Sequence, residues 1–319
     1  MATIPQTMRA AGIDRFGGPS VLKIHRLPTP TPDAGEVLIG VHTAGVGSWD
    51  ADMRGGWWPG EKPKFPVVLG TDGSGIVAAV GSGVRRFKTG DRVYGYSWMN
   101  PKGGFYAEYI AVAAENVAPI PKPLDLRRAG AVPVIGLTAL QGIDDALRLK
   151  RGERIIIHGA SGGVGTMAVQ FAELRGARVF ATASGKDGVA LVRRLGADRV
   201  IDGRGDIASI GKEFAPDGFD AVLALAGKRL SECVDLLRKG GRIAYPNGVE
   251  PAPRRRSGIK IIAYDGVPGV RQWRQLDVAI TRGKPKVPIS AEVSLADAAE
   301  AHRRVTGHVI GKIVLRIRR

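Results

Sequence analysis

The run from Gly159 to Gly165, with the sequence GASGGVG, constrains the fold of this chain more than any other segment. A β-branched run, Ile155–Ile157, precedes it, and a stretch carrying Met167, Val169 and Phe171 follows it. This order predicts a buried strand, a tight turn and a helix. Glycines have no Cβ, so the backbone can turn sharply and approach a ligand closely. The free N–H groups and the dipole of the helix would face the turn, which predicts a site for a pyrophosphate.

The glycines match a dinucleotide-binding pattern incompletely. The strict pattern is G-x-G-x-x-G. Gly162 and Gly165 occupy its last two glycine positions, whereas Ala160 holds the first, directly after Gly159. A glycine-rich loop that binds nothing is the alternative. The strand before the loop, and the helix and the strand starting at Val179 after it, favour a dinucleotide site.

Length and composition bound the class of protein. The 319 residues suffice for two domains, and 44% hydrophobic and 24% charged residues are globular values. No apolar run reaches the roughly 20 residues that span a bilayer, and the N-terminus lacks the features of a signal peptide. The single cysteine, Cys233, excludes an intrachain disulfide and a multi-cysteine zinc site. We therefore expect a cytoplasmic protein without a membrane partner.

The net charge of +17 is compatible with nucleic acid, anionic lipid or an anionic cofactor. The 47 basic residues are spread along the chain, and the densest cluster, Arg254–Arg256, has no interleaved aromatic residue. Because the basic residues are spread out in this way, we do not expect nucleic acid to be the main partner.

The chain divides by its pattern into three parts. Residues 1–124 contain short β segments between turns rich in glycine and proline, which predicts a mostly β, barrel-like domain. Strands alternate with helices in residues 125–265, which predicts an α/β fold with a doubly wound parallel sheet. Residues 266–319 end in a β-type segment, so we expect the chain to return to the first domain.

The end of the second strand of the α/β part indicates which dinucleotide is bound. NAD sites commonly carry Asp or Glu there, whereas NADP sites carry neutral and cationic groups. This chain has Ser184 and Lys186, which can bind a 2′-phosphate by a hydrogen bond and by charge. Asp187 follows, where we expect it to cap the next helix. We therefore expect NADPH, although Lys186 also fits a solvated loop residue.

No metal site is expected. The five histidines include no H-E-x-x-H pair, and one cysteine cannot supply a zinc-binding cluster.

Several segments resemble the zinc-independent quinone oxidoreductases of the medium-chain dehydrogenase/reductase superfamily. The resemblance covers nearly the whole chain and rests on motifs in the same order. These motifs lie at residues 44–50 (AGVGSWD), 65–75 (FPVVLGTDGSG), 80–83, 89–95 (TGDRVYG), 103–109, 136–140, 159–165, 195–202 and 311–315. The resemblance implies a Rossmann NADPH-binding domain and a GroES-like catalytic domain formed by both chain ends. It also implies a homodimer or a tetramer joined through edge strands of the Rossmann sheets, with Ile259–Tyr264 as the candidate edge.

The resemblance assigns cofactor-binding roles to residues of this chain. The pyrophosphate would be held by Ser161, Gly162, Gly163 and Val164, and the 2′-phosphate by Ser184 and Lys186. Further expected cofactor residues are Thr138, Ala226, Gly227, Pro246, Asn247 and, from the returning tail, Lys312.

This chain differs from its relatives at the zinc-ligand positions and at two further positions. Zinc-dependent relatives carry a cysteine just after the Ala-Gly-Val motif and a His-Glu pair where this chain has Thr71 and Asp72. Quinone-reductase relatives usually carry asparagine at the position of Gly47. Their tyrosine after the Val-Ile-Asp strand is Gly203 here, for which Arg204 is expected to compensate.

The reaction implied by the resemblance is hydride transfer from NADPH to a quinone or an α,β-unsaturated carbonyl compound. Reduction of an enone or a ketone also needs a proton donor or a carbonyl-polarising group. The candidates are Tyr94, Tyr96, Ser48 and Asp50, with core packing as the alternative for each tyrosine. Three tryptophans are expected either to shape an apolar pocket or to pack a loop: Trp49, Trp57 and Trp58.

Two other readings stay open at this stage. The chain can be an NADPH-binding protein without catalysis, of a crystallin-like or an RNA-binding kind. Within the enzymes, a zinc-free alcohol dehydrogenase or an enoyl reductase fits the same residues.

Overall fold

The computed structural model describes residues 3–58, 60–307 and 309–318, which form two compact units. Unit 1 comprises Met1–Val134, Pro268–Arg274 and Ile289–Arg319, and unit 2 comprises Ile135–Val267 and Gln275–Pro288. The first boundary therefore follows Val134, later in the chain than the expected break after residue 124. Part of the C-terminal segment belongs to unit 2.

Unit 2 contains a parallel sheet with the strand order β11-β10-β9-β12-β13-β14. Its strands are β9 (Arg154–His158), β10 (Arg178–Ala183), β11 (Arg199–Asp202), β12 (Phe219–Ala224), β13 (Leu237–Pro246) and β14 (Lys260–Tyr264). Counted from β9, this order is the 3-2-1-4-5-6 order of a Rossmann fold. The predicted doubly wound parallel sheet is thereby confirmed.

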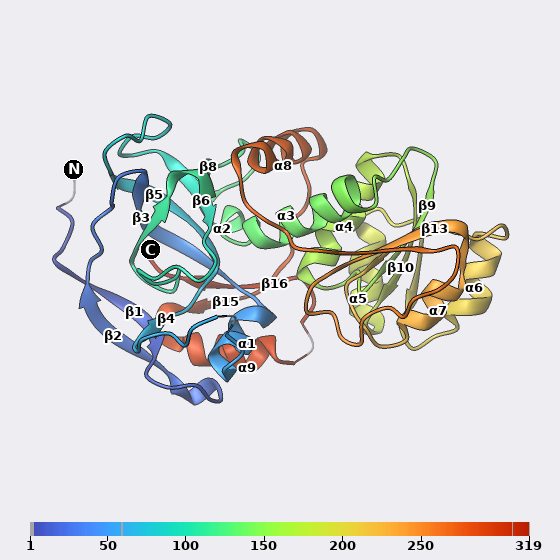
Figure 1. Cartoon of the computed structure of the whole chain (residues 1–319), viewed down its shortest axis with the longest axis horizontal. Helices are drawn as coiled ribbons and strands as arrows, with labels where there is room; N and C mark the ends of the chain where they lie inside the picture. Colours follow the sequence, from blue (N-terminus) through green and yellow to red (C-terminus); the bar gives the residue numbers. More distant parts are fainter. Residues whose placement is uncertain (1–2, 59, 308, 319) are drawn as a thin grey trace. The chain divides into compact units, whose positions relative to one another are not determined.

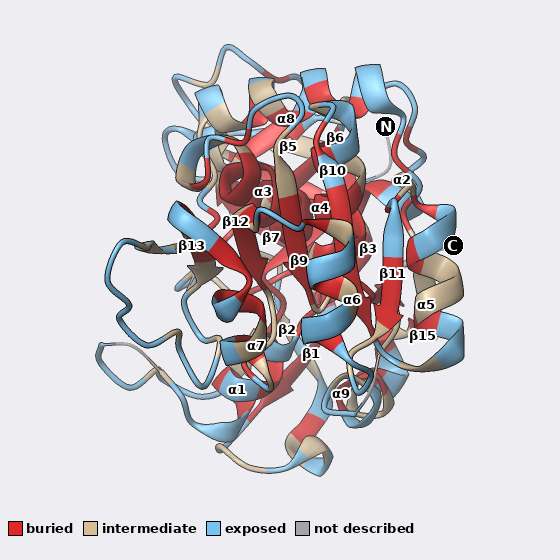
Figure 2. Ribbon diagram, turned by 90° about the vertical axis from the view of Figure 1, so that its right-hand side faces the viewer, coloured by how far each residue is buried: buried red, intermediate tan, exposed pale blue. Residues whose placement is uncertain are grey.

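Helices connect the consecutive parallel strands from β9 to β13, and further helices lie before β9 and after β14 in the chain (Figure 1). They are α3 (Pro133–Gln141), which continues as a π-helical turn (Gly142–Ala146), α4 (Gly163–Leu174), α5 (Gly185–Arg194), α6 (Ile207–Phe214), α7 (Leu230–Asp235) and α8 (Val270–Gly283). In Figure 2, β9, β10 and β12 are largely buried, whereas α5 and α6 expose part of their surface. This burial explains why the strand sequences are apolar without alternation.

Unit 1 is mostly β. Its strands are β1 (Thr7–Ile13), β2 (Leu22–Pro28), β3 (Glu36–Val46), β4 (Val67–Val68), β5 (Asp72–Val80), β6 (Arg92–Tyr96), β7 (Tyr109–Ala113), β8 (Val117–Pro119), β15 (Ile289–Ser294) and β16 (Lys312–Arg316). Its helices are α1 (Ser48–Gly55), α2 (Leu126–Ala129) and α9 (Ala298–Val305), and short 3-10 turns lie at Pro19–Val21, Ala114–Asn116 and Leu295–Asp297.

The C-terminal strands complete the main sheet of unit 1. This sheet has the order β15-β16-β3-β5-β6-β8, with β7 also paired to β3, and a smaller sheet has the order β2-β1-β4. Strand β16 pairs antiparallel with β3 and parallel with β15. The end of the chain is therefore part of the main sheet of unit 1, together with the N-terminal strands.

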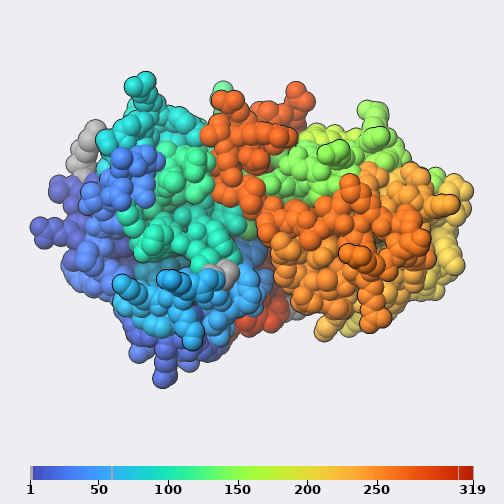
Figure 3. All heavy atoms as spheres, in the orientation of Figure 1, coloured from blue at the N-terminus to red at the C-terminus, as the bar shows by residue number. Residues whose placement is uncertain are grey.

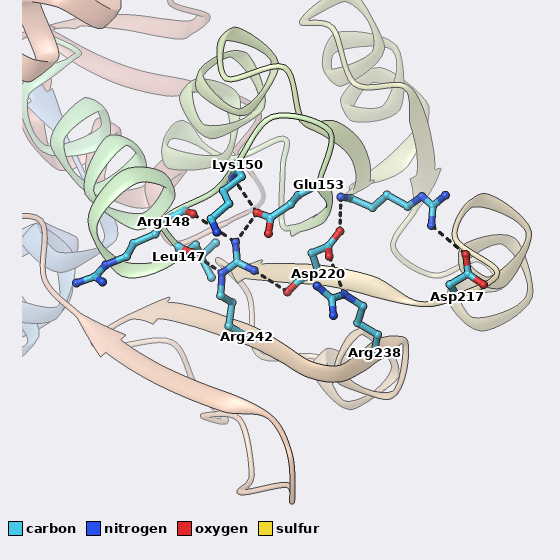
Figure 4. Close-up of polar contacts among 9 residues, drawn as sticks. Leu147, Arg148, Lys150, Glu153, Asp217, Asp220, Arg238 and Arg242 are labelled. Atoms are coloured by element: carbon cyan, nitrogen blue, oxygen red, sulfur yellow. Dashed lines mark hydrogen bonds and ion pairs between the residues drawn. The ribbon is translucent and has the colours of Figure 1, made fainter.

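The amino ends of β9, β12 and β13 are held together by a polar network (Figure 4). Arg242 forms an ion pair with Glu153 and donates to the carbonyl oxygen of Leu147. Arg238 contacts the carboxylate of Asp220 at 2.7 Å, and the same carboxylate accepts the backbone N–H of Arg154 at 2.8 Å. These contacts occupy the edge of the sheet opposite to the glycine loop, so they stabilise the sheet without taking part in that loop.

The segment after β13 lies at the surface of unit 2, where Figure 3 shows the chain around residue 250 in orange. None of the helices in the part of the chain that the structure describes is both long and apolar enough to cross a membrane.

Helix α4 packs very closely on the turn that follows β9. A Cβ added to Gly165 would lie 2.5 Å from the carbonyl oxygen of Gly159 and 2.6 Å from the Cα atom of Ala160. Both neighbours are backbone atoms, so the helix would have to move to accept a side chain. A Cβ added to Gly162 would meet only the oxygen of Gly159, at 3.7 Å.

We expect Gly165→Ala to lower the free energy of unfolding by about 1–3 kcal/mol or more, because overpacking against backbone forces the helix away. Gly162→Ala is the matched control and should change the free energy of unfolding by well under 1 kcal/mol. Urea unfolding followed by circular dichroism measures both. Equal losses in the two variants would contradict the packing argument.

Candidate functional site

The glycine loop leads from the end of β9 to the start of α4. Gly159 has a φ of +87°, in the left-handed region that glycine adopts without strain. The backbone N–H of Ala160 donates to the carbonyl oxygen of Thr182 at 2.8 Å, which fastens the loop to β10. Gly162 immediately precedes α4 and has no side chain to cap its first turn. The first N–H groups of α4 therefore keep the capacity to bind an anion.

The side chain of Ser161 links the glycine loop to the end of β10. Ser161 is buried, and its Oγ atom accepts the backbone N–H of Ser184 at 3.2 Å. The side chains of Ser184 and Lys186 are exposed at the start of α5. The residues expected at the pyrophosphate and at the 2′-phosphate thus belong to one connected part of unit 2.

Sequence analysis did not single out Asp202, which lies beside these residues. Asp202 ends β11, and Arg204, expected to replace the family's tyrosine at the cofactor phosphate, forms an ion pair with it at 3.1 Å. The sequence feature that could have identified Asp202 is its position at the end of the strand that follows β10 in the chain.

The other expected cofactor residues of unit 2 follow strands of the same sheet or lie in α3. Ala226 and Gly227 follow β12, and Pro246 and Asn247 lie at the end of β13. Because the sheet is parallel, these segments share its carboxyl edge with the glycine loop. The Nδ2 atom of Asn247 donates to Asp265 at 2.8 Å.

Gly227 and Thr138 lie in crowded surroundings. A Cβ added to Gly227 would lie 2.1 Å from the carbonyl oxygen of Glu250. The carbonyl oxygen of Thr138 accepts the hydroxyl of Tyr264 at 3.0 Å, and the Thr138 residue is 7% exposed. Thr138 is thus almost completely buried.

Asp50 is the centre of a buried polar network in unit 1. Its carboxylate accepts the backbone N–H of Gly47 at 2.8 Å, the hydroxyl of Thr71 at 3.0 Å and the hydroxyl of Tyr106 at 3.2 Å. The contact with Gly47 closes the start of α1. Asp50 is fully buried, and this burial raises its pKa to about 6.

The network continues through residues that sequence analysis missed. The guanidinium of Arg54 lies 3.2 Å from Nδ1 of His302, and Nε2 of His302 lies 3.3 Å from the hydroxyl of Tyr106. Burial lowers the pKa of His302 to about 3, so its ring is neutral at pH 7. Arginine only donates, so Nδ1 accepts and Nε2 carries the proton. The hydrogen bonds then run in one direction, from Arg54 through His302 and Tyr106 to Asp50.

Lys312 lies inside unit 1, beside Asp72 and Trp49. Its ammonium group lies 3.8 Å from Oδ1 of Asp72, which is too long for a hydrogen bond, and 4.5 Å from the centre of the Trp49 ring. Lys312 Nζ, Asp72 Oδ1 and Trp49 Nε1 have no hydrogen-bond partner among the described residues. Burial raises the pKa of Asp72, and the nearby ammonium opposes this shift.

The four candidate proton donors differ in exposure. The side chain of Tyr94 is completely buried, and its ring centre lies 5.0 Å from that of Trp273. Asp50 is also fully buried, whereas Tyr96 is half-buried at the end of β6 and Ser48 is exposed at the start of α1. Only Tyr96 and Ser48 therefore present surface within unit 1.

The three tryptophans lie in different surroundings. The ring of Trp49 occupies the space beside Gly47, where an added Cβ would lie 2.2 Å from the indole. Trp57 is exposed and its ring centre lies 6.1 Å from that of Trp98. Trp58 packs against the core of unit 1.

The described residues contain no group of three or more His, Cys, Asp or Glu side chains placed to hold a metal ion. Gly47 and Thr71, which match the metal-ligand positions of zinc-dependent relatives, instead both bond to Asp50.

Comparisons with known proteins agree with both units. Residues 33–122 match the family described as "Alcohol dehydrogenase GroES-like domain", and residues 163–251 match "Zinc-binding dehydrogenase". A quinone oxidoreductase of Rattus norvegicus is 33% identical, with 99% of each chain covered. The chain belongs to the quinone oxidoreductase-like members of the medium-chain dehydrogenase/reductase superfamily. It is therefore an oxidoreductase of this superfamily.

Two solved structures illustrate the range of this superfamily. An NAD-dependent alcohol dehydrogenase has 31% identity and a TM-score of 0.90, with 98% of this chain and 100% of the other covered. A mycobacterial protein complexed with NADPH has 29% identity and a TM-score of 0.85, with 97% and 100% covered.

We expect Asp50 to make the stability of the fold depend on pH. The folded protein binds the Asp50 proton more tightly than the unfolded chain does, because the pKa rises from 3.8 to about 6. Protonated Asp50 therefore contributes about 3 kcal/mol to the free energy of unfolding below pH 4. This contribution is lost as the pH rises through about 6. Asp50→Asn should flatten the unfolding free energy between pH 4 and pH 6.

The exposed Asp187 supplies the control, since Asp187→Asn removes an aspartate outside the network. Chemical unfolding at several pH values measures each slope. An unchanged slope in Asp50→Asn would contradict the assignment.

Proposed function

We propose that this protein is a zinc-free oxidoreductase that uses NADPH to reduce a quinone or an α,β-unsaturated carbonyl compound. The observation that carries the proposal is the open glycine loop at the start of α4, joined through Ser161 to exposed Ser184 and Lys186. The quinone oxidoreductase name of the rat relative and the NADPH complex of the mycobacterial neighbour support the proposal.

The residues present fit a dinucleotide. The uncapped N–H groups of Gly163 and Val164 can bind the pyrophosphate, because a Cβ is absent from Gly162 and the loop is open there. Ser184 and Lys186 can bind a 2′-phosphate by a hydrogen bond and by charge. Lys312, buried without a hydrogen-bond partner among the described residues, stays a proposed cofactor contact. When bound, NADPH supplies the hydride.

We propose that no zinc is needed, because Gly47 and Thr71 offer no strong metal ligand and the nearby Asp50 carboxylate is already engaged by three hydrogen bonds. For acceptors that need a proton, we propose Tyr96 as the donor, since it is the candidate tyrosine that retains exposed surface. The buried and free Cys233 fits the reducing cytoplasm that we propose as the location.

The purified protein should oxidise NADPH in the presence of 1,4-benzoquinone, 1,4-naphthoquinone or 2-cyclohexenone, followed by absorbance at 340 nm. A zinc chelator should leave the rate unchanged, and elemental analysis should find no bound zinc. Tyr96→Phe should lower kcat for the enone by about 10²-fold or more. Tyr96→Phe should lower kcat for the quinones less. The matched control is Tyr94→Phe, which changes a buried tyrosine.

The alternative is a non-catalytic protein that binds NADPH. Binding of NADPH without turnover of any acceptor, together with salt-sensitive RNA binding, would favour that alternative. Loss of enone turnover in both tyrosine variants would contradict the assignment of the donor to Tyr96.

We propose that two copies associate through β14. This strand lies at one edge of the unit 2 sheet. An edge strand offers unpaired N–H and C=O groups to a second strand. A depression of about 500 Å³ beside it is lined by Arg255, Arg256, Ser257, Ile259 and Ile261. Arginine and apolar side chains together are typical of interfaces.

Light scattering after size-exclusion chromatography should give the mass of two chains of 33.8 kDa each. Ile261→Lys should shift the population toward one chain, whereas Val278→Lys, at an exposed position on α8, should not. A monomeric wild-type protein would contradict this proposal.

A further inference from the structure

The carboxyl ends of β10 and β11 bring a carboxylate to the expected 2′-phosphate site. The two strands pair in parallel, with Ala183 of β10 opposite Asp202 of β11. Asp202 is therefore level with the residue that precedes Ser184. Its Oδ2 atom accepts the backbone N–H of Gly185 at 3.1 Å, which places the carboxylate against the first turn of α5.

The carboxylate of Asp202 is ionised at neutral pH. Its Oδ1 atom accepts the backbone N–H of Arg204 at 2.9 Å and lies 3.2 Å from Nε of the same residue. The Nη2 atom of Arg204 lies 3.1 Å from Oδ2. The hydrogen bonds from Arg204 lower the pKa of Asp202 to about 2.

The carboxylate of Asp202 adds a negative charge to a site that, from the sequence, was expected to be neutral and positive. NAD sites carry an acidic group at the end of the second strand, where it binds the ribose 2′-hydroxyl. Here Ser184 and Gly185 occupy that end, but the third strand supplies the acidic group from the side. Arg204, expected at the cofactor phosphate, is paired with this carboxylate instead.

The pair between Asp202 and Arg204 is open to solvent. The side chain of Arg204 is 85% exposed and that of Asp202 is 32% exposed. Ion pairs of this kind contribute little to stability, so Arg204 can exchange its partner. The neighbouring Arg229 is less free, because it pairs with Glu232 and donates to the carbonyl oxygen of Gly203 at 2.7 Å.

We propose that Asp202 is the residue that limits the preference for NADPH, so that the protein binds both NADH and NADPH. With NADH, the carboxylate accepts the ribose 2′-hydroxyl. With NADPH, Arg204 leaves Asp202 and joins Lys186 at the 2′-phosphate, which the carboxylate repels. This inference rests on the proposed function, because it assumes that a nicotinamide dinucleotide occupies the glycine loop.

The test measures the dissociation constants of NADH and NADPH by isothermal titration calorimetry at fixed ionic strength. The same titrations use adenosine 5′-monophosphate and adenosine 2′,5′-bisphosphate, which report the 2′-phosphate without the nicotinamide. Asp202→Asn keeps an acceptor for the N–H of Gly185 but removes the charge. The ratio of the NADH to the NADPH dissociation constant should rise by about tenfold in this variant.

Asp187→Asn is the matched control, because it removes an exposed negative charge from the first turn of α5, whereas the carboxylate that pairs with Arg204 belongs to Asp202. This control should change the ratio by less than about twofold. Arg204→Ala should weaken NADPH and adenosine 2′,5′-bisphosphate by about tenfold and leave NADH unchanged. The midpoint of thermal unfolding identifies a variant that has lost its fold.

Two outcomes overturn different statements. If the wild-type protein binds both nucleotides and Asp202→Asn changes the ratio no more than Asp187→Asn does, the role of Asp202 is wrong and the proposed function stands. If the wild-type protein binds neither nucleotide, both the role of Asp202 and the proposed function are wrong.

Discussion

The contact between α4 and the turn after β9 is the constraint on which unit 2 depends. The helix starts where Gly165 meets the backbone of Gly159 and Ala160, and a single added Cβ would collide there. Strand β9 pairs with both β10 and β12, so the turn is fixed within the middle of the sheet. The uncapped helix start is thereby held at the carboxyl edge, where an anion can meet several N–H groups at once.

A different physical solution organises the interior of unit 1. Asp50 is a buried carboxylate, and burial of a charge is costly unless hydrogen bonds compensate for it. Gly47, Thr71 and Tyr106 supply three such bonds, and His302 and Arg54 orient the last donor. Positions at which zinc-dependent relatives carry metal ligands thus belong to a hydrogen-bond network here. The network connects the start of α1, the residue before β5 and α9.

The charges near the expected cofactor site show why net charge is a poor guide to local potential. The chain carries a formal charge of +17, yet Arg204 and Arg229 are each paired with a carboxylate at the carboxyl edge of the sheet. An exposed pair presents little net field and can rearrange when a stronger anion arrives.

The sequence by itself determined the elements whose signals are local. The apolar strand of Ile155–Ile157, the glycines after it and the alternating pattern up to Tyr264 predicted the parallel sheet, and the single cysteine excluded a multi-cysteine zinc site. Helix α1 was not predicted within the mostly β residues 1–124, because its sequence lacks a clear period and its stability comes from tertiary partners. Only the tertiary structure brought Asp202 beside Gly185, and His302 to Tyr106. Strand register and long-range packing decide such contacts, and neither can be read from residues that are far apart in the chain.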